Sequence, residues 1–145
     1  HGDSTGKVHR QELGTDFDGE VIFSAFQTPF FHMGDPEVRK VLYNVATYLR
    51  SEGDSTIVLG VEYDYQNPDV LSPSNYDLTI EGVAAFYGEA LYDSTAIYEG
   101  NPSPVFRTSV TGSGKSVSLR YVTSGVEASH TIQGIVVTYG LGDRL

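Results

Sequence analysis

Histidine, cysteine and paired carboxylates carry much of the chemistry of enzymes and metal sites, and this sequence offers them in few useful patterns. It contains four histidines, His1, His9, His32 and His130, and no cysteine. No two histidines have the His-x-His or His-x3-His spacing of a metal site, and the lack of cysteine excludes thiolate sites. We therefore expect His32 and His130 to be partly buried residues at strand ends.

Carboxylates act in pairs in glycosidases and bind calcium in loops. Glu62 and Asp64 alternate along one expected strand, but many solvated acids do so, and the chain has no tryptophan to stack against a sugar. Residues 64–69 (Asp-Tyr-Gln-Asn-Pro-Asp) supply oxygen ligands but lack the glycine and the distal glutamate of an EF-hand. No Gly-x-Ser-x-Gly motif indicates a serine hydrolase. The sequence predicts a protein that is not an enzyme, with no catalytic residue and no cofactor or metal.

The segment 111–116 (Thr-Gly-Ser-Gly-Lys-Ser) superficially resembles a phosphate-binding loop. The true motif, Gly-x4-Gly-Lys-Ser/Thr, has glycine where this chain has Ser109, and it leads into a helix rather than a strand. We expect a hairpin turn here instead. The lysines and arginines are scattered along the chain, so the sequence gives no support for a surface that reads nucleic acid.

The acidic residues, in contrast, are concentrated in the middle of the chain. Residues 51–100 contain ten of the 19 acids and no lysine or arginine, and the whole chain has a net charge of −10. Such a block repels polyanions and opposes unwanted association. It is either a purposeful acidic face, for which the candidates are Glu62, Asp64, Glu81 and Glu89, or a well-solvated surface.

The elements that position these residues are expected to be strands. Sixteen glycines and an aromatic share of 12% accompany abundant valine, threonine and tyrosine, which favours strands and tight turns. Short segments with period-two alternation recur about every ten residues, as in antiparallel sandwiches and barrels. We predict an all-β fold, an antiparallel β-sandwich or jelly-roll-like domain with at most one or two short helical turns. The expected strands are 20–27, 40–50, 56–63, 76–80, 105–110, 116–123 and 130–139, and the stretch 82–98 fits either a helix or strands.

The turns between the strands predict how the strands pair. The clearest hairpin joins 40–50 to 56–63 through a Ser-Glu-Gly-Asp turn. A second hairpin joins 105–110 to 116–123, and 116–123 is expected to lie beside 130–139. On the inward faces of these strands we expect six mostly buried residues: Val45, Leu59, Val117, Leu119, Ile132 and Val136.

Length and composition indicate one domain. Residues 1–19 form a polar segment that leads into a single β-sandwich domain over 20–145, since 145 residues without a linker or repeat suit one core. A turn at Gly34-Asp35-Pro36 is expected to carry a helical turn through Arg39. No apolar run approaches the roughly 18–20 residues of a membrane span, so no membrane insertion is expected. The polar opening at His1, without an initiator methionine, indicates a piece of a longer polypeptide.

Seven short segments carry a resemblance to a known family. They are Val8-His9-Arg10, Thr15-Asp16-Phe17-Asp18-Gly19, Thr28-Pro29, Gly34-Asp35-Pro36, Arg39-Lys40, Ser129-His130-Thr131-Ile132-Gln133-Gly134 and Tyr139-Gly140-Leu141-Gly142. In this order they resemble the C-terminal part of tail tubular (nozzle) proteins of short-tailed bacteriophages. The chain departs from that pattern in ending on Gly142-Asp143-Arg144 rather than on a plain basic terminus, and it lacks the long upstream region of those proteins.

The resemblance implies a structural virion protein of a phage tail. Copies of the chain would form a ring around the DNA channel and contact adjoining tail proteins. DNA would pass without specific binding, because an acidic wall makes no strong, salt-dependent contacts with phosphates. The alternative is a receptor- or carbohydrate-binding β-sandwich module, in which loops around Tyr63, Tyr65, Tyr76 and Tyr87 grip a ligand. An enzyme ranks third.

Overall fold

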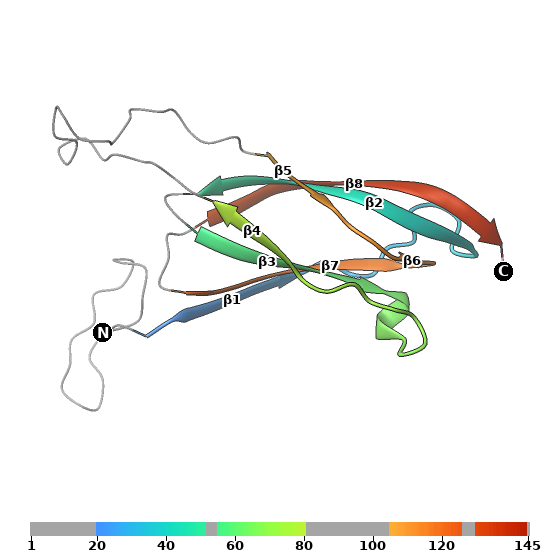
Figure 1. Ribbon diagram of the computed structural model, residues 1–145, viewed down its shortest axis with the longest axis horizontal. Coiled ribbons are helices and arrows are strands. Elements are labelled where there is room, and N and C mark those ends of the chain that lie inside the picture. Colours follow the sequence, from blue (N-terminus) through green and yellow to red (C-terminus); the bar gives the residue numbers. More distant parts are fainter. Residues whose placement is uncertain (1–19, 52–54, 81–104, 126–129, 145) are drawn as a thin grey trace, which may run out of the picture.

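Eight β-strands and one short helix make up the described part of the chain in a computed structural model (Figure 1). The structure describes residues 20–51, 55–80, 105–125 and 130–144. The elements are β1 (Ile22–Gln27), β2 (Val38–Ser51), β3 (Ser55–Tyr63), η1 (Asp64–Gln66), β4 (Tyr76–Ile80), β5 (Val105–Ser109), β6 (Ser113–Gly114), β7 (Val117–Gly125) and β8 (His130–Arg144).

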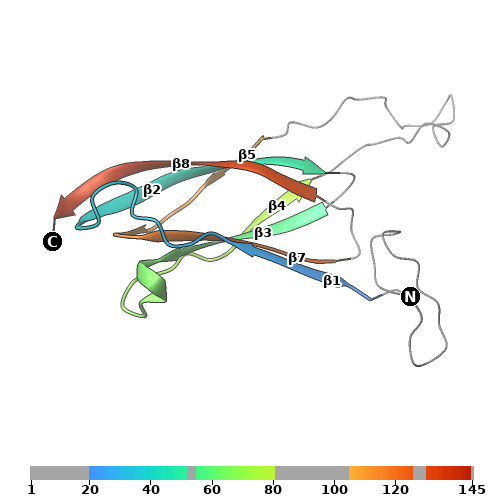
Figure 2. The same cartoon turned by 180° about the vertical axis from the view of Figure 1, so that it is seen from behind.

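The strands form two antiparallel sheets that lie face to face (Figure 1, Figure 2). The first sheet has the strand order β1-β7-β3-β4. In the second sheet, β2 pairs with β8 along one edge and with β5 and β6 along the other. The expected all-β sandwich is confirmed, and each of the seven expected strands overlaps an observed one. The stretch 82–98 and the segment 1–19 lie outside the described residues.

The expected strand pairings, in contrast, are wrong. β2 and β3 do not form a hairpin, because β3 pairs with β4 and β7 in the first sheet while β2 belongs to the second. Likewise β7 pairs with β1 and β3 rather than with β5 or β8. The strands of each expected pair thus lie in opposite layers. Period-two alternation shows which face of a strand is apolar, but not which strand pairs with it. Two strands bury their apolar faces equally well when they pair in one sheet and when they lie in two sheets that pack face to face.

The core lies between the inner faces of the two sheets. Val45, Leu59, Val117 and Leu119 are buried as expected, and Ile132 is partly buried against the same cluster. The prediction for Val136 is wrong, because this side chain is 51% exposed.

A β-bulge explains the exposure of Val136. Tyr48 pairs with Gly134 but the next residue, Leu49, pairs with Ile132, so Gln133 is an extra residue in the ladder. One extra residue reverses the facing of all the residues on one side of it. The inward residues after the bulge are therefore Ile135 and Val137, which pack against the core, and Val136 faces outward.

The start of β2 also differs from the sequence prediction. A helical turn through Arg39 is not formed, because β2 already begins at Val38. Lys40, the third residue of β2, is completely buried, and its ammonium group donates hydrogen bonds to the backbone carbonyls of Asp35 and Lys115. Lys40 therefore ties the Gly34-Asp35-Pro36 turn to the loop before β7. The sequence gives no direct signal of this role, since lysine is rarely buried.

Candidate functional site

Glu62, one of the four candidate acids, lies on the outer face of β3 within a network of polar side chains. Its Oε2 atom accepts hydrogen bonds from the side-chain amides of Gln27 (2.9 Å) and Gln66 (2.7 Å). Its Oε1 atom lies 3.6 Å from Nε of Arg120, and the Glu62 side chain is only 13% exposed. The carboxylate therefore links β1, β3 and β7, and it is not a freely solvated charge.

Asp64, the second candidate, opens a turn with an unusual backbone. Asp64, Tyr65 and Gln66 have φ values of +46°, +58° and +61°, a left-handed conformation that costs roughly 1–2 kcal/mol for each L-residue. The Oδ1 atom of Asp64 accepts hydrogen bonds from the backbone N–H groups of Lys115 (2.7 Å) and Ser116 (2.9 Å). These bonds hold the turn in its conformation.

The donors of these bonds belong to the segment 111–116, which superficially resembles a phosphate-binding loop. The amides of Lys115 and Ser116, which could cradle an anion, are already bound to an internal carboxylate. A strand, β7, follows the loop and no helix does. The loop does not form the expected hairpin either, because β5 and β7 lie in different sheets.

The structure separates the roles of the candidate acids. Glu62 and Asp64 bind different partners, whereas Glu81 and Glu89 lie outside the described residues. In the loop of residues 64–69, which offers oxygen ligands without an EF-hand pattern, the side-chain oxygen of Asn67 accepts a hydrogen bond from the N–H of Asp69 (3.0 Å). Among the described residues, no group of three or more His, Asp and Glu side chains could hold a metal ion. An acidic channel face stays a prediction.

The strained turn presents an aromatic cluster at one end of the sandwich. The ring of Tyr65 lies 4.6 Å from that of Phe30 and 6.5 Å from that of His32, measured between centroids. Tyr65 is 65% exposed. A rigid turn with an exposed aromatic ring is a surface on which a ligand can stack, and its Tyr65 was among the tyrosines expected to grip a ligand.

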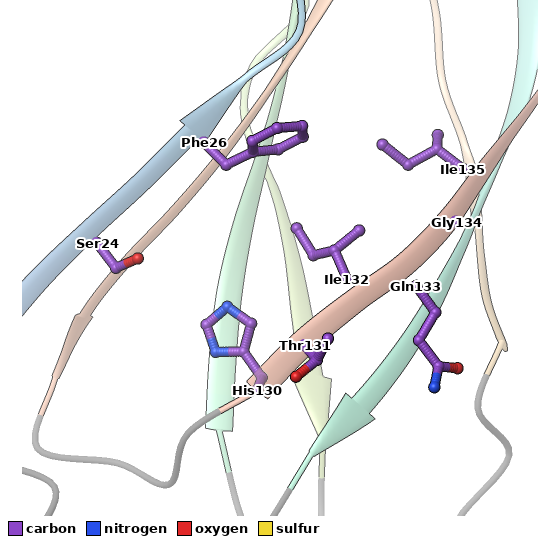
Figure 3. A pocket seen from close by; sticks show the side chains of 8 residues that line it. All are labelled: Ser24, Phe26, His130, Thr131, Ile132, Gln133, Gly134 and Ile135. Carbon is purple, nitrogen blue, oxygen red and sulfur yellow. The ribbon is translucent and has the colours of Figure 1, made fainter. Parts of the chain in front are cut away.

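An open groove of about 500 Å³ lies between β1 and β8 (Figure 3). Ser24 and Phe26 of β1 form one wall, and residues 130–135 of β8 form the other. Phe26, His130 and Ile132 point into the space between the two strands (Figure 3). The sequence did not predict this groove, because it depends on which strands end the two sheets.

His130 is the titratable side chain of this groove. It is partly buried at the start of β8, as expected, and burial lowers the pKa of its imidazole. His32 is also partly buried, but it lies in the connection between β1 and β2 rather than at a strand end. Ser24 lies across the groove from His130, yet none of the described residues that line the groove carries a carboxylate. A Ser-His-Asp triad therefore has no third member among the lining residues.

Two tyrosines with titratable hydroxyl groups, Tyr63 and Tyr121, are buried in the interior. Tyr63 donates a hydrogen bond to the backbone carbonyl of Thr111 (3.1 Å), and the hydroxyl of Tyr121 lies 2.8 Å from Oγ1 of Thr47 in the opposite sheet. Burial is the main cause that raises the pKa of both phenols, and Tyr76 raises that of Tyr63 further.

These raised pKa values predict alkaline sensitivity. In the unfolded chain both phenols ionise near the ordinary value of about 10, whereas in the folded chain they stay protonated to higher pH. The stabilisation is therefore fully present below about pH 10 and is lost as the pH rises above it. The free energy of unfolding, measured with urea, should fall as the pH rises from about 9 to about 11. It should fall less steeply with pH for Tyr63→Phe than for the natural chain. An equal dependence of the free energy of unfolding on pH in the two proteins would contradict the raised pKa of Tyr63.

The described residues define an all-β, sandwich-like domain. A scan against protein-family models finds no match, and neither a search of curated proteins nor a search of solved structures finds one. Among the described residues, no helix is both long and apolar enough to cross a membrane.

Proposed function

We propose that this chain is a structural component of a bacteriophage tail, in which copies of the chain assemble around a channel that conducts DNA. The proposal gives the protein no catalytic role. Its partners are further copies of the chain and adjoining tail proteins, and its location is the virion.

The observation that carries this proposal is a contrast in charge between two parts of the chain. One side of the sandwich carries two strand edges to which no other described strand is paired, and neither β1 nor any described residue that lines the groove has a charged Asp, Glu, Lys or Arg side chain. The block 51–100, in contrast, has acids and no bases. Uncharged edges suit contacts between protein chains, whereas acidic surfaces let DNA pass without binding its phosphates.

Three of the segments that carry the family resemblance have clear structural roles among the described residues. Thr28, before Pro29, ends β1, and its hydroxyl oxygen accepts a hydrogen bond from the N–H of Leu119 (2.9 Å). Lys40 fastens the Gly-Asp-Pro turn, and Gly140 lies where a Cβ atom would approach the hydroxyl of Tyr43 to 2.6 Å. Residues with structural roles are what a structural protein needs, and they support the tail assignment only to that extent.

Electron microscopy of the purified full chain tests the proposal. We expect ring-shaped assemblies that do not retain duplex DNA at physiological salt. Because Glu62 and Asp64 are bound within the domain, charge reversal should use the exposed acids Asp69 and Asp77 of the acidic block. Changing both to Lys should create salt-sensitive DNA retention, whereas the matched pair Glu20→Lys and Glu37→Lys, outside the block, should not. Absence of rings, or equal retention by both pairs, would contradict the proposal.

A second candidate function rests on the aromatic cluster around Tyr65. Its exposed ring, stacked near Phe30 on a strained turn, favours a receptor- or carbohydrate-binding module. Glycan-array binding that is lost in Tyr65→Ala and retained in the control Tyr48→Ala would favour this function over the tail assignment.

A further inference from the structure

One side of the sandwich ends in two strand edges to which no other described strand is paired. β1 is the last strand of the first sheet, and β8 pairs only with β2 in the second. The N–H of Thr28 donates to the carbonyl of Leu119 across the end of the β1–β7 ladder. Alternate residues of an antiparallel strand point their N–H and C=O groups to opposite sides, so those of Phe23 and Ala25 point away from β7. The outer edge of β1 is therefore able to pair with another strand.

β1 also extends the first sheet beyond the cover of the second. Phe26 pairs with Tyr121, so Phe26 and Ile22 share the core-facing side of the sheet with Tyr121. Tyr121 is 2% exposed, whereas Ile22 is 45% and Phe26 is 49% exposed. The groove between β1 and β8, into which Phe26 points, lies where one more strand in the second sheet would cover this face of β1 (Figure 3).

We propose that a second copy of this chain supplies that strand, and that β1 of each copy pairs with the free edge of β8 of the other. β1 and β8 run in the same direction (Figure 1, Figure 2). A two-fold axis parallel to the strands therefore brings each β1 beside the other copy's β8 with both contacts equivalent. The two β1 strands then face each other across the layers. Ile22 and Phe26 of one copy pack against Ile22 and Phe26 of the other, and both sheets become continuous through the contact.

The charge distribution favours a second copy as the occupant. Two copies of a chain with a net charge of −10 repel each other over most of their surfaces. The residues of β1 (Ile-Phe-Ser-Ala-Phe-Gln) and the described residues that line the groove include no Asp, Glu, Lys or Arg. Natural proteins usually protect free strand edges with charges or proline. β1 has neither. The electrostatic repulsion between two copies is therefore weakest at the edge where the backbone N–H and C=O groups of β1 are available for pairing.

The contact between β1 and β8 specifies one interface of the self-assembly in the proposed function. Only in this respect does the inference rest on that function. It occupies the β1–β8 side of the sandwich and leaves the β4–β5 side for other contacts. Rings without this contact would overturn the inference and keep the proposed function, whereas paired copies without rings would keep the inference alone.

Cysteine cross-linking of the full chain tests the contact, because the natural chain has no cysteine. Ser24 lies in the middle of β1 on the groove side, so the two copies of Ser24 face each other near the axis. Ser24→Cys should give a two-chain product with a bifunctional thiol reagent that spans about 10 Å, the spacing of packed sheets. The control Asp69→Cys, on an exposed loop, should give little. Equal cross-linking of the two variants, or none of Ser24→Cys, would overturn the proposal.

A pair of lysine variants on the same strand gives an independent measurement. Phe26→Lys places a charge inside the proposed contact and should weaken pairing, measured by light scattering over a concentration series, at least about tenfold. Phe23→Lys makes the same change of charge on the outer face of β1, where Phe23 is 67% exposed, and should leave the pairing nearly unchanged. A monomer at all concentrations, or equal weakening by the two variants, would overturn the proposal.

Discussion

Truncation of Leu119 to alanine is expected to lower the free energy of unfolding by about 2–5 kcal/mol. Leu119 lies in β7 opposite Val61 of β3, is 1% exposed and belongs to the core cluster between the sheets. Removing buried methyl groups loses their transfer free energy and leaves a cavity that the two packed sheets fill only in part. Urea unfolding measures the change as a lower midpoint with little change of slope.

Val136→Ala is the matched control for this truncation. It also shortens an aliphatic side chain of a long strand, but at an outward position that is 51% exposed. We expect a change within roughly 0.5 kcal/mol. A loss of several kcal/mol at Val136, with little effect at Leu119, would mean that the inner and outer faces of the strands have been interchanged.

Gly112→Ala is expected to be about as damaging, although it adds only one methyl group. Gly112 has a φ of +115°, and a Cβ atom there would lie 2.6 Å from Cε2 of Tyr63. Tyr63 is completely buried, so its ring has no open space into which it can move. Backbone strain of about 1–3 kcal/mol and overpacking of about 1–3 kcal/mol together predict a loss of about 2–6 kcal/mol.

Two other glycines separate these two causes. At Gly34, φ is +101° but nothing lies within 4 Å of an added Cβ, so Gly34→Ala measures backbone strain alone. At Gly134, φ is not positive and the nearest atom is 3.9 Å away, so Gly134→Ala should be close to neutral. If Gly112→Ala lowers the free energy of unfolding no more than Gly34→Ala does, the close approach of the added Cβ atom to Tyr63 does not contribute to the loss.

The candidate site was predictable only in part. Glu62 and Asp64 were singled out because they lie in the acidic block, yet the structure binds both within the domain. A carboxylate in a sequence shows its charge but not its hydrogen-bond donors, and the donors of Asp64 are amides about fifty residues away, on Lys115 and Ser116. The buried Lys40 shows the same limit. Its acceptors are backbone carbonyls, which every residue has and no sequence pattern marks.

The sequence by itself determined the fold class and the position of the strands. Period-two alternation bounded by glycine and proline turns is a local property, because neighbouring side chains of an extended chain point to opposite faces. Segments such as β2 and β7 could therefore be recognised without knowing their partners. The lack of cysteine and of metal-ligand spacings was equally plain from the residues alone.

Only the tertiary structure decided which strands pair, which faces are inward and where surfaces meet. Pairing β2 with β8 rather than with β3 buries the same apolar faces, so the choice depends on the packing of the whole chain. The bulge at Gln133 arises within that pairing, and it turns Val136 outward and Val137 inward. The groove between β1 and β8 exists because those two strands end their sheets. Each of these features depends on residues far apart in the chain, and local alternation carries no information about such contacts.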